Sequence, residues 1–297
     1  MKIKSILYIA GLAVSGAACS DYLETETPDE FSDVNFWKSE SNVRTYNWEF
    51  YNLFAGYGNG SVPGDFYFTS FSDDQASPSF QQFAVAAPAT SAAWDWYFIR
   101  KANIMLERID QVPLSEEAKN HWKGIARFFR ALDYFNKVRL FGDIPWISKS
   151  LDIAETDMIY KPRDPRALVM DSILADIDFA VANLREDDEE NTVNRDIALA
   201  LKSRICLYEG TYRKYHTELG LTDAAEFLLA AKNASEELID EGGYMLGSYK
   251  DLYSSMDLAA HPEVLLYKKY LSGILTHSVI GFTNSTTQMR GLTKSAV

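Results

Sequence analysis

The sequence predicts a mainly all-α protein built as an irregular, tetratricopeptide-like array of helix pairs. Apolar residues recur at helical spacing over most of the chain beyond residue 38. Gly and Pro interrupt that spacing at points where helices should end. Large and small residues alternate along the apolar faces, which favours close antiparallel packing. No repeat of fixed period is evident, so we expect the array to be irregular.

Residues 1–18 have the layout of an export signal. Lys2 and Lys4 precede an apolar run over residues 6–14, and small residues follow at 15–18. The run is shorter than the roughly 20 residues that a membrane-spanning helix needs. Cys19 comes next, as in bacterial lipoprotein signals, where that thiol is acylated. We therefore predict lipidation at Cys19; the alternative is an ordinary secretory signal with an incidental cysteine.

Residues 19–37 are predicted to be an acidic tether. The segment contains no basic residue before Lys38, and its acidic residues are Asp21, Glu24, Glu26, Asp29, Glu30 and Asp33. A run of one charge sign interrupted by proline favours a solvated chain. The helical domain is accordingly expected to cover residues 38–297.

Four helices are expected between residues 115 and 243. Ser115 caps the first, which Gly142 ends. Asp164 caps the second, with Pro165 at its first position. The fourth stops at Gly242. Their apolar faces are, in chain order, Trp122, Ile125, Phe129 and Leu132; Val169, Ile173, Ile177, Ala180 and Leu184; Ile197, Leu201, Ile205 and Tyr208; Phe227, Ala231, Ala234 and Leu238.

Two regions break the helical pattern. Residues 56–92 are rich in Gly, Ser, Pro and aromatic residues and predict a long irregular excursion. A loop of that length in a compact domain is uncommon and usually functional. After residue 262 the helical series stops and a β-like run begins.

Composition and motifs argue against several functions. The net charge of −13 makes nucleic acid an unsuitable partner. The histidines lack metal-ligand spacing, and no phosphate loop or nucleophile elbow occurs, so we expect neither an enzyme nor a cofactor. Cys206 lies in an apolar helical pattern and is predicted to be a buried free thiol. The acidic run at 186–190 is read as a solvated turn, with a calcium site as the alternative.

The long excursion and the helix behind it supply candidate ligand-binding residues. A saccharide site combines aromatic rings, which stack on apolar C–H faces, with amide or carboxylate groups that bind hydroxyls. Trp94 and Trp96 are expected two positions apart on a helix, so at most one should face a shared surface. The candidates are Tyr67, Asp73, Asp74, Gln75 and Trp96.

Several ordered blocks resemble the SusD/RagB family of outer-membrane nutrient-binding lipoproteins. They are "WDWYFIRKANIMLERID" at 94–110, "ARFFRALDYFNKVRLFGDIPW" at 126–146, "RDPRALVMDSILADIDFAVANL" at 163–184, "ALALKSRICLYEGTYRKYH" at 198–216 and "HPEVLLYKKY" at 261–270. The resemblance implies four tetratricopeptide-like helix pairs and a partner, a TonB-dependent transporter of the SusC type. Family members are much longer, which implies that a carboxy-terminal part carrying some of the ligand site is missing here.

The predicted function is therefore capture of oligosaccharides by a protein lipid-anchored to the outer membrane and facing the exterior, with delivery to the transporter. Peptide capture by the same scaffold is one alternative. A helical-repeat scaffold that acts only through protein contacts is another.

Overall fold

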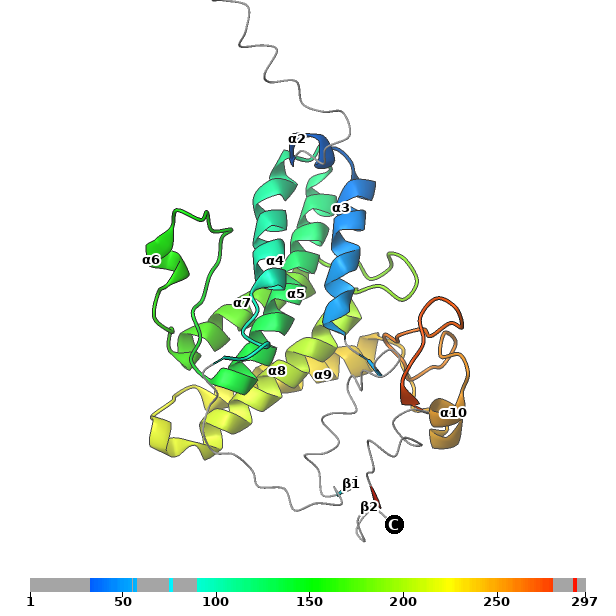
Figure 1. Ribbon diagram of the computed structural model, residues 1–297. Helices are drawn as coiled ribbons and strands as arrows, with labels where there is room; N and C mark the ends of the chain where they lie inside the picture. The colour runs from blue at the N-terminus through cyan, green and yellow to red at the C-terminus, as the bar shows by residue number, and fades with distance from the viewer. Residues whose placement is uncertain (1–32, 55, 58–74, 77–89, 280–290, 293–297) are drawn as a thin grey trace, which may run out of the picture.

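The computed structural model describes residues 33–54, 56–57, 75–76, 90–279 and 291–292 (Figure 1). Within these ranges the regular secondary structure is almost entirely helical, as predicted. The α-helices are α2 (Asp33–Phe36), α3 (Glu40–Trp48), α4 (Tyr97–Arg108), α5 (Glu116–Phe141), α6 (Thr156–Ile159), α7 (Arg166–Asn183), α8 (Arg195–Tyr215), α9 (Ala224–Glu241) and α10 (Tyr249–Ser254). The 3-10 helices are η1 (Glu49–Leu53), η3 (Ile109–Gln111) and η4 (Thr217–Leu219), and the strands are β1 (Gln75–Ala76) and β2 (Gly291–Leu292).

Helices α5 and α7 pack antiparallel at the centre of the array. Gly124 lies against Leu184 at one end of the pair, and Arg130 binds Asp176 farther along. Residue numbers therefore rise along α5 as they fall along α7. A Cβ placed on Gly124 would lie 3.1 Å from Cδ2 of Leu184. Glycine here lets the two helices approach closely, as the alternation of large and small residues predicted.

Helices α8 and α9 form a second antiparallel pair. The hydroxyl groups of Ser203 and Ser235 lie 2.6 Å apart, and Gly210 packs against Leu228. A Cβ on Gly210 would lie 2.8 Å from Cγ of Leu228, a distance that real side chains do not tolerate. Helix α4 packs on α5 and α7 packs on α8, so consecutive long helices form one layered array (Figure 1).

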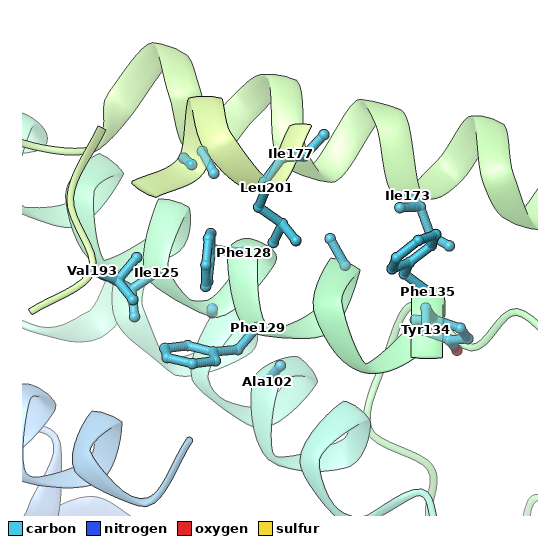
Figure 2. Close-up of a cluster of buried hydrophobic side chains, with 14 of the residues drawn as sticks. Ala102, Ile125, Phe128, Phe129, Tyr134, Phe135, Ile173, Ile177, Val193 and Leu201 are labelled. Atoms are coloured by element: carbon cyan, nitrogen blue, oxygen red, sulfur yellow. The ribbon is translucent and has the colours of Figure 1, made fainter. Parts of the chain in front are cut away.

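Helix α5 supplies most of the large core side chains. Trp122, Phe128, Phe129 and Tyr134 are fully buried, and the ring of Phe129 stacks on Phe50 at 5.2 Å. Figure 2 shows how side chains of α5 meet those of α4, α7 and α8 in one cluster. The sequence predicted a single apolar face for α5. The helix is instead buried around most of its circumference, because α3, α4 and α7 all contact it.

The helix ends test the capping predictions. The Ser115 hydroxyl accepts a hydrogen bond from the Ala118 N–H at 3.2 Å, and Gly142 ends α5 with φ of 70°, so both predictions are confirmed. The predicted cap at Asp164 is wrong. Helix α7 begins at Arg166 after Pro165 and has no side-chain cap. The Asp164 carboxylate accepts the Trp146 N–H at 2.6 Å instead, which closes the connection between α5 and α7.

The sequence predicted that the tether would extend to residue 37, but the folded region begins earlier. Residues 33–36 form α2, Phe36 packs against the core, and Trp37 is 7% exposed. Trp37 is buried and Phe36 is partly buried despite the acidic run before them. The predicted export signal, Cys19 and most of the tether fall in residues 1–32, outside the described residues. In the described part of the chain, no helix combines the length and apolar character needed to cross a bilayer.

The β-like run after residue 262 forms no strand. Residues 264–270 contain no helix either. The Asn191 side chain replaces a neighbouring strand: its amide donates to the Tyr267 carbonyl at 2.8 Å and accepts the Tyr267 N–H at 3.0 Å. Elsewhere, the prediction for Cys206 is confirmed, because this thiol is buried and free.

Candidate functional site

A cavity of about 590 Å³ lies between the start of α4 and the connector, which we define as residues 143–165 between α5 and α7. Figure 1 shows the connector, with α6 in its middle, projecting from the side of the array. Helix α4 and the residues just before it contribute Trp94, Trp96, Ile99, Arg100 and Asn103 to the cavity. The connector contributes Pro145, Ile147, Lys149, Leu151, Ile153, Ile159, Tyr160, Lys161 and Arg163.

Two indole rings form the aromatic part of this cavity. The rings of Trp94 and Trp96 meet edge to face, with centroids 5.4 Å apart, and both are half-buried. Trp94 also packs edge-on against Phe141 at 4.9 Å. The expectation that at most one of the two tryptophans faces a shared surface is wrong. Helix α4 begins only at Tyr97, so the helical spacing on which that expectation rested does not apply.

The connector is fixed to the array by side chains of α4 and α5. The Asn103 amide donates to the carbonyl groups of Ile147 at 3.0 Å and of Lys149 at 2.9 Å. The Tyr134 hydroxyl accepts the N–H of Ile147 at 2.7 Å. These bonds satisfy backbone groups that would otherwise lack partners in a segment without regular structure. The wall of the cavity is therefore held in place before any ligand arrives.

A buried ion pair holds the Asn103 side chain that makes these bonds. The Arg130 guanidinium binds both carboxylate oxygens of Asp176, at 2.7 and 2.8 Å, and donates to the Asn103 carbonyl oxygen at 2.6 Å. Its charge also lies 5.3 Å from the centre of the Trp146 ring. A paired guanidinium in this fork geometry is one of the stronger polar interactions available in a protein interior. The network links α7, α5 and α4 to the cavity wall.

A second buried pair lies behind the indoles. Asp133 and Lys137, one turn apart on α5, bind at 2.6 Å, and the ammonium group lies 5.8 Å from the Trp96 ring centre. Burial raises the pKa of Asp133, although the neighbouring Lys137 charge opposes that effect. The other carboxylate oxygen of Asp133 has no hydrogen-bond partner within the residues the structure describes. Polar groups thus lie behind Trp96, whereas the indole ring of Trp96 itself lines the cavity.

The two ends of the connector meet at a backbone bridge. The Asp164 N–H donates to the Ile144 carbonyl at 3.1 Å. The Asp164 carboxylate also binds Lys161 at 2.6 Å. Partial burial alone would raise the pKa of Asp164, but the hydrogen bonds from Lys161 and the Trp146 amide outweigh it and lower that pKa. Asp164 therefore remains ionised and keeps the connector closed at its base.

Of the predicted site residues, only Trp96 is placed in the cavity. Tyr67, Asp73 and Asp74 lie outside the described residues, and the backbone of Gln75 pairs with Leu292 in the two-stranded ladder. The sequence reasoning missed the whole connector wall. Its length was the available signal, because a long connection between helices that contains exposed apolar residues such as Ile153 and Tyr160 is typical of a functional loop.

The acidic run at 186–190 is not simply a solvated turn. The Asp188 side chain is 10% exposed and binds Arg44 of α3 at 2.7 Å and Arg185 at 3.3 Å. The pair with Arg44 fastens α3 to the turn that follows α7. Among the residues described, no three His, Cys, Asp or Glu side chains are arranged to hold a metal ion, so the calcium alternative gains no support there.

Comparison with known proteins gives one consistent match. A SusD-like family model, described as "Starch-binding associating with outer membrane", matches residues 2–207. SusD-like protein P38 of Formosa agariphila is 27% identical over 218 residues, an alignment that covers 68% of this chain and 41% of that protein. The chain spans less than half the length of the relatives it matches.

Solved structures share the fold. The crystal structure of a SusD-like protein from Bacteroides fragilis aligns with a TM-score of 0.64 at 23% identity, over 84% of this chain and 48% of that one. A laminarin-binding SusD-like protein aligns with a TM-score of 0.59 at 21% identity, over 77% of this chain and 51% of that one. Since the family model covers more than half of the sequence and the helical array is the same, the chain belongs to the SusD-like family.

Proposed function

We propose that this chain captures oligosaccharides at the outer membrane and passes them to a TonB-dependent transporter of the SusC type. One observation carries the proposal: two neighbouring indoles face a cavity whose opposite wall is fixed by hydrogen bonds. The proposed function is binding and transfer, without catalysis. Two comparisons support a saccharide over other ligands. The family model is described as starch-binding, and a protein of similar fold binds laminarin.

The cavity has the chemistry that a sugar ring requires. Its volume of about 590 Å³ lies within the range usual for sites of small ligands. Trp94 and Trp96 offer flat apolar faces for the C–H side of a pyranose ring. Lys149 lines the same cavity and is exposed, so its ammonium group offers donors to hydroxyl groups. A peptide ligand, the first alternative, would use the apolar connector residues more than the indoles.

Calorimetric titration with laminari- and malto-oligosaccharides tests this proposal. Replacing one stacking indole, as in Trp96→Ala, should reduce affinity by roughly 5- to 150-fold, by analogy with base stacking. Trp48→Ala is the matched control, because Trp48 is 44% exposed on α3 and does not line the cavity. Tyr67→Ala and Asp74→Ala test the residues predicted from the sequence.

Three results would change the proposal. Unaltered binding by folded Trp94→Ala and Trp96→Ala variants would move the saccharide site elsewhere. Binding of peptides in place of sugars would support the first alternative. Failure of the chain to bind any small ligand would favour the protein-interaction scaffold.

Membrane attachment requires a separate test. We propose that an acylated Cys19 anchors the protein and that it faces the exterior, with residues 20–32 as an acidic tether. The charge pattern of residues 1–19 and the family's association with the outer membrane support this. Cys19→Ala should move the protein from the membrane fraction to the soluble periplasm. Unchanged partitioning would refute lipid anchoring, and a protease-protection assay on whole cells would test the orientation.

A further inference from the structure

The charged side chains that line the cavity all have the same sign. They are Arg100, Lys149, Lys161 and Arg163, and within the described part of the chain no carboxylate lines the cavity. The chain as a whole has 42 acidic and 29 basic residues, so a wholly cationic lining is opposite to its overall charge. A concave, partly apolar wall concentrates the field of such charges toward its interior.

Two of these cations donate to backbone carbonyls and not to carboxylates in the described ranges. Lys161 binds Asp164 and Lys149 binds Glu155. In contrast, Arg100 donates to the Leu151 carbonyl, and Arg163 donates to the carbonyls of Phe141 and Asp143 at 3.4 Å. Neither guanidinium forms an ion pair with a carboxylate among the residues that the structure describes. Both residues are exposed, so both are accessible from the cavity.

The two guanidinium groups lie next to the two indoles. The Arg163 charge is 5.0 Å from the centre of the Trp94 ring. Arg100 lies in the first turn of α4, and its backbone N–H donates to the Trp96 carbonyl at 2.9 Å. Both side chains line the cavity. A sugar ring stacked on the indoles would therefore have a guanidinium near its edge, where an acidic substituent would lie.

Resting on the saccharide-binding function proposed above, we infer that the cavity selects acidic oligosaccharides, whose rings carry carboxylate or sulfate groups. Arg100 and Arg163 would bind the acidic group, because the guanidinium fork matches the geometry of a carboxylate or sulfate and binds it in two-point fashion. The indoles would bind the ring itself. A neutral glucan could use the indoles alone and would gain nothing from the two uncompensated charges.

Matched pairs of oligosaccharides test the inference on the whole chain. Tetragalacturonate is compared with its fully methyl-esterified form, and a sulfated carrageenan tetrasaccharide with its desulfated form. The acidic member of at least one pair should bind at least about 10-fold more tightly than its neutral counterpart, as expected for a hydrogen-bonded charge pair. Its affinity should also fall as the salt concentration rises.

Variants separate the charges from the aromatic surface. Arg163→Gln and Arg100→Gln should each reduce the affinity for the acidic member by about 10-fold while leaving that of the neutral member unchanged. Lys232→Gln is the control, because it removes one charge from an exposed i,i+4 pair on α9, away from the cavity. Trp96→Ala should weaken both members alike.

The outcomes distinguish the two proposals. If neutral members bind as tightly as acidic ones, or if the arginine variants bind the acidic members normally, the selectivity inference is wrong and saccharide capture stands. If neither these pairs nor the neutral laminari- and malto-oligosaccharides bind, saccharide capture itself is wrong.

Discussion

Two arginines of this protein have similar neighbours but different surroundings. The guanidinium of Arg130 lies 5.3 Å from the Trp146 ring centre, and that of Arg163 lies 5.0 Å from the Trp94 ring centre. Arg130 is buried and binds both oxygens of Asp176, whereas Arg163 is exposed and, among the described residues, donates its hydrogen bonds to backbone carbonyls at 3.4 Å. Contact with an aromatic ring therefore does not by itself indicate the role of an arginine.

The difference follows from the cost of removing charge from water. A buried charge without a partner is strongly destabilising, so Arg130 must be paired for the array to fold. An exposed guanidinium retains its hydration and needs no carboxylate. Pairing makes Arg130 a positioning residue for the cavity wall. Because Arg163 is not paired with a described carboxylate, it is available to a ligand.

Removing the charge of Asp176 should have the largest effect. Asp176→Asn keeps the shape of the side chain but leaves the buried Arg130 uncompensated, and we expect a loss of about 3 to 5 kcal/mol in the free energy of unfolding. Urea denaturation measures this loss. Asp178→Asn is the control, because its carboxylate is exposed and binds Lys202 at the surface, so it should cost at most about 1 kcal/mol. Equal losses for both variants would contradict the distinction drawn between buried and exposed pairs.

His121 extends the comparison to a buried basic group without a close ion pair. Its ring is fully buried, and Asp188 lies 3.9 Å away. Burial, reinforced by the Arg185 charge, lowers the pKa of His121 to about 4. The unfolded chain binds a proton near the ordinary value of 6.5, so between these values the unfolded state holds more protons. The stability contribution is therefore complete above pH 6.5 and is lost as the pH falls toward 4.

The expected loss from His121 between pH 7 and pH 4 is up to about 3 kcal/mol. Urea denaturation across this range, with wild type and His121→Gln side by side, measures it. The glutamine variant cannot titrate, so its stability should fall less steeply with decreasing pH. Parallel curves for the two proteins would show that other groups account for the acid sensitivity.

Asn103 contacts both the buried Arg130 and the connector, and its replacement should have an intermediate effect on stability. Asn103→Ala removes the donors to the Ile147 and Lys149 carbonyls and one acceptor of Arg130, at a cost of about 1 to 3 kcal/mol. Asn103→Asp keeps the acceptor but loses the donors. In both variants, hydrogen exchange at residues 147–150 should accelerate. Unchanged exchange in the aspartate variant would show that the amide does not hold the wall.

The cavity rim should tolerate substitution best. Counting the contacts of the described residues, Lys149→Met breaks one exposed pair with Glu155 and Arg163→Gln breaks no ion pair, so each should change the free energy of unfolding by less than about 1 kcal/mol. Thermal melts test both. A large loss of stability in Arg163→Gln would show that this arginine is structural, as Arg130 is.

Local patterns in the sequence predicted the helices well. The Ser115 cap, the Gly142 stop and the burial of Cys206 depend on neighbours within a few residues or on one apolar face, and each was confirmed. The Asp164 cap failed because its carboxylate binds the Trp146 amide, 18 residues away in the chain. Such a contact has no periodic signature.

The site was harder to predict for the same reason. Asn103 reaches carbonyl groups 44 and 46 residues away, and no spacing rule connects α4 with that part of the connector. Trp96 could be chosen from its type and its place at a helix start. Tyr67, Asp73 and Asp74 remain predictions, because they lie outside the described residues.

The backbone bridge between Ile144 and Asp164 makes the connector an exchangeable module. Both ends of the segment leave the array at one point, so its middle can be lengthened, shortened or replaced without separating α5 from α7. The entropy of closing such a loop changes slowly with its length. One wall of the cavity can thus change in length or sequence while the helices stay constant, and a foreign connector grafted between these two residues should leave the packing of α5 on α7 unchanged.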